Sequence, residues 1–256
     1  MLSAILLGLI EGVTEFLPIS STGHLLIAEH WLGRRSDLFN IVIQAGAILA
    51  VTLIYRERLW QLLVRSNEPA NRRYAAQLVT AFLITAVLGA IAAKLGFKLP
   101  DAVQPVAWAL VIGGLWMIVA EWVAARRPDS REISWGVVVA VGLAQIVAAI
   151  FPGTSRSAAA IFAAMLAGTS NRSAATEFTF LVGIPTMYAA SAYALLKELR
   201  HATGAEHWGE LGLAFLVSMV SAFVAVKWLL GYVRTHRFTG FAVYRMVLGA
   251  ALILLA

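Results

Sequence analysis

A cluster of residues that could carry out acid–base or nucleophilic chemistry lies near the beginning of the chain. Residues 11–24 read EGVTEFLPISSTGH, so two carboxylates, a run of three hydroxyl residues and an imidazole fall within fourteen residues. Apolar residues precede and follow this stretch. A charged side chain near the centre of a bilayer costs at least ~2.5–3.5 kcal/mol, so these groups should face protein or water. The stretch is therefore a candidate functional site.

The two carboxylates of this stretch are Glu11 and Glu15. Their spacing places both side chains on one face of a helix. Such a pair suits general acid–base catalysis or a site for a divalent cation, Mg²⁺ or Ca²⁺. The alternative is a pair of buried carboxylates whose hydrogen bonds fix the local structure.

The hydroxyl run Ser20, Ser21 and Thr22 follows Pro18, where a new helix can begin. A serine or threonine there is a good N-cap. The start of a helix also binds anions, and a hydroxyl close to a base can act as a nucleophile. His24 lies three residues after Ser21 and shares its helix face. Any of the three hydroxyls could therefore be the nucleophile with His24 as its base or as the acid for the leaving group, and the roles of hydroxyl and imidazole could be exchanged.

A second polar stretch, PGTSRS at residues 152–157, contains the one basic residue between Glu132 and Asn171, which is Arg156. A guanidinium group matches the oxygens of a phosphate with two parallel hydrogen bonds. Arg156 is therefore a candidate phosphate clamp, with a buried salt bridge to Glu11 or Glu15 as the alternative. The neighbouring residues expected to surround the phosphates are Gly153, Thr154, Ser155 and Ser157, together with Ser20 and Thr22.

Three other polar residues lie in apolar surroundings. Gln44 is a candidate lining residue of the same cavity. Glu121 and Arg245 are expected to pair across helices in a structural role.

The composition indicates an integral membrane protein. The 256 residues are 60% hydrophobic and 13% charged, and the mean hydropathy is +0.80. Soluble domains contain about 25% charged residues. The absence of cysteine excludes disulfides and thiolate metal sites. The net charge of +6 comes from residues between the apolar runs, so we expect a lipid bilayer and no nucleic acid as partner. No organic cofactor is expected.

The apolar runs predict an all-α polytopic fold with six transmembrane helices and two re-entrant helical hairpins. Each run is about 20 residues long, enough to span a bilayer as a helix. The expected spans are 38–56, 75–96, 104–124, 175–196, 211–232 and 239–256. Regions 1–32 and 136–168 are each broken by a proline and small polar residues. Irregular backbone at membrane depth is tolerated only inside protein or beside a cavity, so each region should be a hairpin.

The chain is expected to be a single membrane domain, 1–256, made of two repeats. Glu11 corresponds to Gln145 and Pro18 to Pro152, with an offset of about 134 residues; Phe39 corresponds to Phe178, with an offset of 139. Repeat 1 covers about 1–124 and repeat 2 about 133–256. Three spans in each repeat make the second inverted relative to the first. The alternative is that the similarity reflects composition alone.

Loop charges predict the orientation of the chain. One set of loops carries Arg56, Arg58, Arg65, Arg72, Arg73, Arg126, Arg127, Arg131, Arg172, Arg234 and Arg237. The other set carries Arg34, Arg35, Lys98, Lys197 and Arg200. Cytoplasmic loops are rich in basic residues, so we expect the first set to be cytoplasmic and both termini to lie outside.

The two polar motifs resemble the signatures of the bacterial undecaprenyl-diphosphate phosphatases, the BacA family, and the similarity extends through residues 39–44 to FAVYR at 241–245. The second motif departs at Ala158 and Ala160, where the family commonly has Gly and Thr. A hydroxyl at position 160 is therefore missing here.

The resemblance implies a catalytic set of Glu11, Glu15, Ser21, His24 and Arg156. The implied reaction is hydrolysis of undecaprenyl diphosphate to the monophosphate and inorganic phosphate. That reaction recycles the carrier lipid of peptidoglycan synthesis and is associated with bacitracin resistance. The implied setting is the bacterial inner membrane, with a polyprenyl diphosphate as partner, the active site open to the periplasmic face, and a homodimer as an open possibility. The alternative function is a lipid-phosphate transporter or flippase that uses the same site.

Overall fold

The structure is a computed structural model that describes residues 1–96, 102–201 and 207–255. Lys98, counted among the loop charges, lies outside the described residues, and so does Ala256 at the end of the last expected span. All regular elements in the described ranges are helices. They are α1 (Leu2–Thr14), α2 (Ser21–Leu32), α3 (Asp37–Ile54), α4 (Arg56–Val64), α5 (Pro69–Lys94), α6 (Val103–Ala124), α7 (Trp135–Ile150), α8 (Arg156–Ala167), α9 (Arg172–His201), α10 (Trp208–Tyr232) and α11 (Thr239–Leu255).

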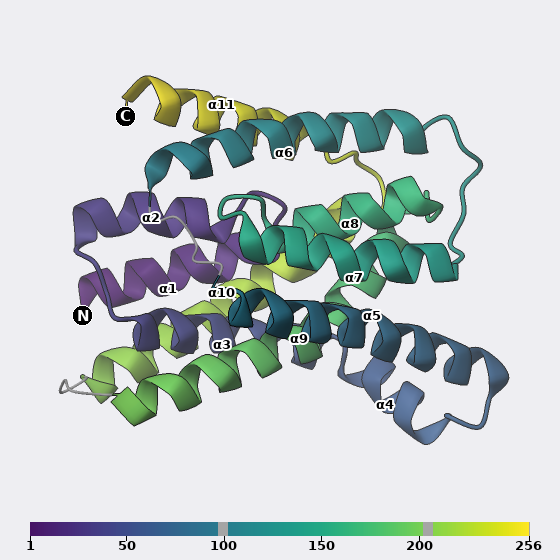
Figure 1. The fold of residues 1–256 in the computed structure, drawn as a ribbon, viewed down its shortest axis with the longest axis horizontal. Helices are drawn as coiled ribbons and strands as arrows, with labels where there is room; N and C mark the ends of the chain where they lie inside the picture. Colours follow the sequence, from purple (N-terminus) through teal and green to yellow (C-terminus); the bar gives the residue numbers. More distant parts are fainter. Residues whose placement is uncertain (97–101, 202–206, 256) are drawn as a thin grey trace.

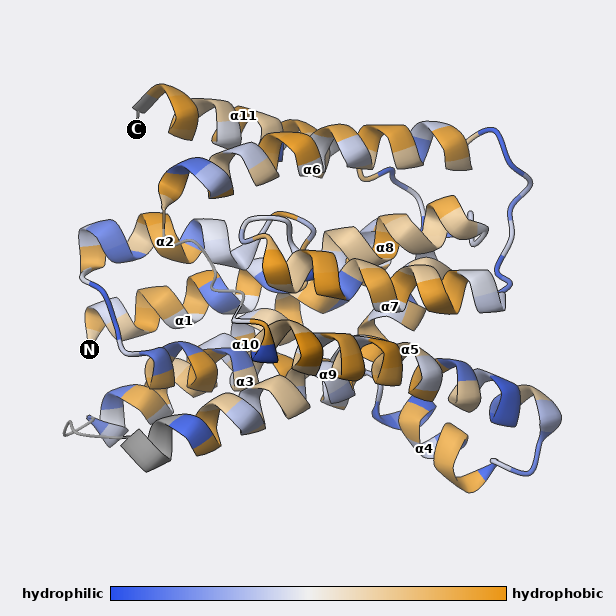
Figure 2. Cartoon of the chain, in the orientation of Figure 1, coloured by the Kyte–Doolittle hydropathy of each residue, from blue (hydrophilic) through white to orange (hydrophobic). Residues whose placement is uncertain are grey.

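The helices agree with a polytopic membrane fold. Five of those described are long and apolar enough to cross a membrane, namely α3, α5, α6, α9 and α10. The sixth expected span is α11, a shorter apolar helix of 17 residues. The surface carries large apolar side chains, such as Leu83, Trp116 and Val220. Figure 2 shows these apolar faces along the helices and the polar residues at both ends of the bundle.

Both regions that we expected to be hairpins consist of two helices joined by a tight turn. α1 ends at Thr14, Pro18 lies in the turn, and α2 begins at Ser21. In the second region, α7 ends at Ile150 and α8 begins at Arg156. A proline inside a helix removes a hydrogen bond and clashes with the preceding turn, which favours the ends of α1 and α7 before Pro18 and Pro152. Figure 1 shows the hairpins entering from opposite ends of the bundle, with their turns meeting near its middle.

The first helix of each hairpin packs against a long helix of the other half of the chain. α1 contacts α10, and α7 contacts α5. Glycines allow both approaches: a Cβ added at Gly8 would lie 2.6 Å from the carbonyl oxygen of Ala214, and one added at Gly142 would lie 3.1 Å from that of Ala81. α6 and α11 form a further close pair at one edge of the bundle (Figure 1).

The two ends of the bundle differ in the loops that they contain. Both chain ends and the connection between α2 and α3 lie at one end (Figure 1). α4, the connection from α4 to α5 and the connection after α6 carry many of the arginines and lie at the other end (Figure 1). One helix was not expected from the apolar pattern: α4, a short helix whose buried apolar residue is Leu62.

Candidate active site

The turns of the two hairpins share an unusual backbone feature. Ser20 and Ser155 have φ values of 74° and 66° and are the non-glycine residues with positive φ in the described part of the chain. Each serine is an N-cap: Ser20 accepts a hydrogen bond from the N–H of Gly23 at 3.3 Å, and Ser155 from that of Ala158 at 3.4 Å. Strained backbone of this kind costs ~1–3 kcal/mol and clusters at functional sites. The caps begin α2 and α8 where the two turns meet.

Direct hydrogen bonds hold the two turns together. The hydroxyl of Ser157 donates to the carbonyl oxygen of Leu17 at 3.1 Å and lies 3.1 Å from the hydroxyl of Ser155. The hydroxyls of Ser155 and Ser157, which we expected around the phosphates, thus also take part in contacts within the protein.

Arg245 of α11 binds both turns at once. Its side chain is fully buried and donates to the carbonyl oxygens of Gly153 and Thr154 at 3.0 Å and of Pro18 at 3.4 Å. A further bond at 3.1 Å goes to the carbonyl oxygen of Ala109 in α6. Sequence reasoning missed this role, because a lone arginine in an apolar span signals a need for partners but does not identify backbone acceptors.

The expected pair between Glu121 and Arg245 is wrong. Glu121 accepts two hydrogen bonds from Arg172, at 2.8 and 2.6 Å, and one from the backbone N–H of Phe238 at 2.9 Å. Glu121 lies near the end of α6, Arg172 begins α9, and Phe238 precedes α11. The ion pair therefore connects three helices in a structural role, and the basic partner of Glu121 is Arg172.

The two carboxylates and Ser21 form the centre of the site. Glu11 is 2% exposed and Glu15 is 7% exposed. The Ser21 hydroxyl donates to Oε2 of Glu15 at 2.5 Å. Oε2 of Glu11 has no hydrogen-bond partner among the described residues, and the charges that act on Glu11 are those of Glu15 and Arg156. A carboxylate that accepts the proton of a serine hydroxyl is the arrangement of a general base and its nucleophile.

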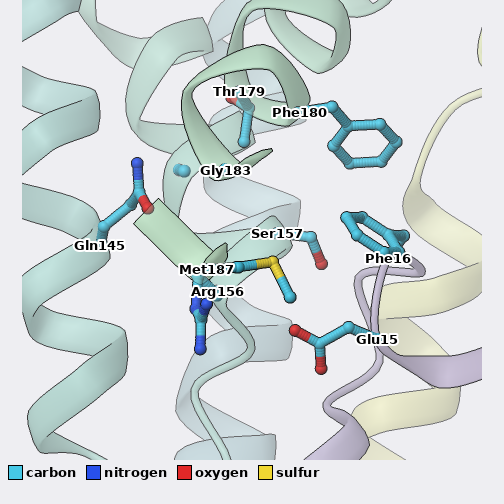
Figure 3. Close-up of a pocket in the computed structure, with 10 residues that line it drawn as sticks. Glu15, Phe16, Gln145, Arg156, Ser157, Thr179, Phe180, Gly183 and Met187 are labelled. Carbon is cyan, nitrogen blue, oxygen red and sulfur yellow. The ribbon is translucent and has the colours of Figure 1, made fainter. Parts of the chain in front are cut away.

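Arg156 is the first residue of α8 and faces Glu15 across a small cavity (Figure 3). Its Nη1 atom is buried and has no hydrogen-bond partner in the described ranges. A guanidinium at the start of α8, where the capped start of α2 also lies, is suited to bind an anion.

His24 does not contact Ser21. Its Nδ1 lies 2.7 Å from the carbonyl oxygen of Ser20, and its Nε2 lies 2.6 Å from the hydroxyl of Tyr244. The rings of His24 and Tyr244 are stacked, with centroids 5.7 Å apart. Because a carbonyl only accepts, Nδ1 carries a proton, and in the neutral ring Nε2 accepts from Tyr244. The side chain that accepts a hydrogen bond from Ser21 is therefore Glu15 and not His24. Tyr244 is a second residue of α11 that sequence reasoning missed.

A cavity of about 1000 Å³ opens beside Glu11, Ser21 and Thr22, and Gln44 lines it too. It extends to Gly33 and Asp37 at the end of the bundle where the chain termini lie. Its other walls combine polar residues, namely Glu29, His30, Arg34 and Asn40, with apolar ones that include Leu25, Leu26, Ile27, Ile41, Val103 and Leu252. We call it the large cavity.

Two of the expected phosphate ligands face a different part of the molecule. Thr154 lines an apolar groove of about 690 Å³ between α6, α7 and α8. Gly153 has a φ of 88°, and a Cβ there would lie 2.7 Å from the carbonyl oxygen of Val106. Their carbonyl groups are the ones that bind Arg245. The structure thus brings Glu11, Glu15, Ser21 and Arg156 together and leaves Gly153 and Thr154 against α6.

Comparison with known proteins adds a family to this geometry. The family described as bacitracin resistance protein BacA matches residues 4–251. The chain belongs to the BacA family. A protein of Rhizobium johnstonii named undecaprenyl-diphosphatase is 66% identical over 253 residues, covering 98% of this chain and 96% of the relative. A protein of Xanthomonas axonopodis pv. citri with the same name is 61% identical over 255 residues, covering 99% and 96%.

Among the described residues of this BacA-family chain, the acidic residues at the candidate site are the pair Glu11 and Glu15. The described residues contain no group of three or more His, Asp or Glu side chains that could hold a metal ion by themselves. Mg²⁺, however, is often held by one or two carboxylates together with substrate phosphates and water. Glu11, with its unpaired Oε2, and Glu15 fit that role.

Proposed function

We propose that this chain hydrolyses undecaprenyl diphosphate to undecaprenyl phosphate and inorganic phosphate. The observation that carries the proposal is the hydrogen bond from Ser21 to Glu15, whose carboxylate faces the guanidinium of Arg156 where the two hairpin turns meet. Relatives at 61–66% identity that are named undecaprenyl-diphosphatase support the same reaction. The product would return the carrier lipid to peptidoglycan synthesis, in keeping with the bacitracin-resistance name of the family.

In the proposed mechanism, Oγ of Ser21 attacks the terminal phosphorus while Glu15 accepts its proton. The bond from phosphorus to the bridging oxygen breaks, and undecaprenyl phosphate leaves. Water then attacks the phosphoserine, which releases inorganic phosphate and restores the Ser21 hydroxyl. Arg156 and the N–H groups at the starts of α2 and α8 stabilise the charge on the transferred group.

A divalent cation fits beside this mechanism. Glu11 and Glu15 would hold it together with phosphate oxygens, and when bound it would neutralise charge on the diphosphate. His24 lies one helical turn after Ser21, and its imidazolium form would supply a proton to the departing phosphate, because in the neutral ring both nitrogens are bonded to Ser20 and Tyr244.

The shape of the large cavity supports a lipid substrate. Its inner end carries Glu11, Ser21 and Gln44, which suit a diphosphate. Its walls carry Leu25, Ile41 and other apolar side chains, which suit a prenyl chain. The substrate would therefore place its head group at the meeting point of the turns and its tail along α2 and α3.

We further propose that the fold is an inverted repeat, with repeat 1 at about 1–124 and repeat 2 at about 133–256. Gly8 of the first half contacts Ala214 of the second half, and Gly142 of the second half contacts Ala81 of the first. This reciprocal packing supports the repeat. The cap serines Ser20 and Ser155 support it as well. In this layout α11 is the sixth span, and the two hairpins are re-entrant.

The arginine-rich loops would face the cytoplasm of a bacterial inner membrane. Both termini and the mouth of the large cavity would then lie on the periplasmic side, since they share one end of the bundle.

One assay tests the reaction. Purified protein in detergent micelles is incubated with a long-chain prenyl diphosphate, with and without a chelator, and released phosphate is measured. Micelles have no second compartment, so a transporter would bind the lipid without releasing phosphate. Catalytic release supports hydrolysis, whereas binding without release would overturn it in favour of a carrier. Loss of release with chelator, restored by Mg²⁺ or Ca²⁺, would support the cation.

A further inference from the structure

A small cavity lies beside Arg156 and Glu15. Its volume is about 20 Å³, and it lies between α7, α8, α9 and the turn after α1. Figure 3 shows Glu15, Arg156, Gln145 and Thr179 around it. Phe16, Phe180 and Met187 complete its wall. We call it the small cavity.

Four buried polar atoms beside the small cavity have no hydrogen-bond partner among the described residues. They are both amide atoms of Gln145, the hydroxyl of Thr179 and Nη1 of Arg156. Gln145 is 2% exposed and Thr179 is 5% exposed, so bulk water does not satisfy them. Each unpaired buried group costs about 1–3 kcal/mol, and such groups are nearly always paired in native proteins. Four of them around one space indicate a ligand in that space.

The size of the small cavity restricts the ligand. A cavity needs a volume of roughly 10–15 Å³ to hold a water molecule, and the water needs 2–4 polar partners. The small cavity has both. A phosphate group, with five heavy atoms, is much larger than one water and would not fit.

The positions of these residues relate the small cavity to the large one. Gln145 is the counterpart of Glu11, Thr179 of Asn40 and Gly183 of Gln44, by the offsets of 134 and 139 residues. Glu11, Asn40 and Gln44 line the large cavity, and their counterparts line the small one. An amide both donates and accepts hydrogen bonds. Beside a guanidinium it therefore suits a neutral ligand, whereas a carboxylate side chain at the same position would form an ion pair with the guanidinium.

We propose that the small cavity binds one water molecule, held by Gln145, Thr179 and Arg156, and that Gln145 acts through this water as a positioning residue for Arg156. The water holds one side of the guanidinium and leaves its other donors free for the phosphoryl group. This inference rests on the hydrolysis proposed above.

The first test removes the polar groups while keeping their shape. Gln145→Leu and Thr179→Val should each lower kcat/KM for the prenyl diphosphate about 10–100-fold, the range for residues that orient a catalytic group. Thr179→Ser should restore most of the loss seen in Thr179→Val. Ser191→Ala is the matched control, because Ser191 is also a buried, unpaired hydroxyl of α9 but does not line the small cavity. Unchanged kcat/KM in both Gln145→Leu and Thr179→Val would overturn the proposal.

The second test separates positioning from a general loss of structure. In an Arg156→Lys background, Gln145→Leu should lower kcat/KM by no more than about twofold, because residues that act through one another are not additive. An equal loss in both backgrounds would overturn the proposal, as would a structure that resolves water and shows a dry cavity. If the wild-type protein releases no phosphate, the proposed function fails. If the wild-type protein releases phosphate and the Gln145 and Thr179 variants have the same kcat/KM as the wild type, only the inference about the water is contradicted.

Discussion

The two hairpins have nearly the same backbone and very different chemistry. Each has a helix, a turn with a proline, a serine cap with positive φ and a second helix of 12 residues. The residue after the cap is Ser21 in the first hairpin and Arg156 in the second. Glu11 of the first corresponds to Gln145 of the second. The first hairpin thus carries the proposed nucleophile and the carboxylates, and the second carries the cation.

This division has a structural consequence. Neither hairpin holds a complete site, so the proposed activity depends on how accurately the two turns meet. Two sets of contacts fix that meeting: the Ser157–Leu17 hydrogen bond, and the bonds from Arg245 to the carbonyl oxygens of Pro18, Gly153 and Thr154. The proposed repeat would therefore combine unlike side chains from equivalent positions at one point.

The largest effect should come from removing the charge of the second hairpin. Arg156→Ala should lower kcat/KM by about 10³-fold or more, the range for an arginine that stabilises a transferred phosphoryl group. Arg156→Lys should recover part of this loss, because an ammonium keeps the charge but not the planar fork. Steady-state phosphate release measures both variants.

Arg73→Ala is the control for this loss. Arg73 lies near the start of α5 and pairs with Glu132 at 3.6 Å in an exposed position. The activity of the Arg73→Ala variant should stay close to that of the wild type. Substantial turnover by folded Arg156→Ala protein would remove the cation from the proposed mechanism and, with it, the contrast between the hairpins.

The next effect concerns the Ser21–Glu15 pair of the first hairpin. Ser21→Ala and Glu15→Gln should each lower kcat by about 10²–10³-fold, and the double variant should be little worse than either, because nucleophile and base act as a unit. A short reaction of the wild type, quenched and digested, should yield phosphoserine at position 21 by mass spectrometry. Thr14→Val is the control, since the Thr14 hydroxyl bonds only to Ile10 within α1. Retained turnover by Ser21→Ala would instead favour direct attack by water or by His24.

A smaller loss is expected from Arg245, which aligns the two turns without belonging to either hairpin. Arg245→Met should lower both kcat/KM, by about 10–100-fold, and the midpoint of thermal unfolding, because it leaves buried carbonyl groups unpaired at about 1–3 kcal/mol each. Arg245→Lys should be intermediate, since one ammonium cannot reach all four acceptors. Normal unfolding and turnover in Arg245→Met would show that the turns meet correctly without it.

The apolar runs and the prolines were enough to predict most of the fold. All six expected spans correspond to helices, and both hairpin turns contain the expected proline. α4 was missed because it is short and carries three arginine or glutamate residues in its first turn. In the site, spacing predicted that Glu11 and Glu15 belong together. It could not reveal that Ser21 faces Glu15 instead of His24, or that Arg245 binds backbone carbonyls, because both depend on how distant segments pack.

The comparison also extends to how tightly each hairpin is packed. At Gly8 a new Cβ would meet a backbone carbonyl at 2.6 Å, whereas at Gly142 the nearest atoms, at 2.9 Å, belong to the side chain of Ile84. The overlap is deeper at Gly8, so Gly8→Ala should destabilise by about 1–3 kcal/mol and Gly142→Ala by less. Thermal unfolding at one scan rate and in one detergent measures this. Gly212→Ala, with open space around it, is the control. Equal losses would mean that the hairpins are held equally tightly.

The smallest effect should come from Tyr244, the neighbour of Arg245 on α11. Tyr244→Phe removes the hydrogen bond to Nε2 of His24 but keeps the stacked ring. One such bond contributes about 0.5–1.5 kcal/mol, so kcat should fall roughly 2–10-fold. Tyr188→Phe is the matched control, because its hydroxyl also bonds between helices, to Thr52, away from the site. If Tyr244→Phe instead lost as much activity as Ser21→Ala, the phenol itself would act on the substrate. The proton donor would then come from the second half of the chain, and the division of charge between the hairpins would no longer describe the site.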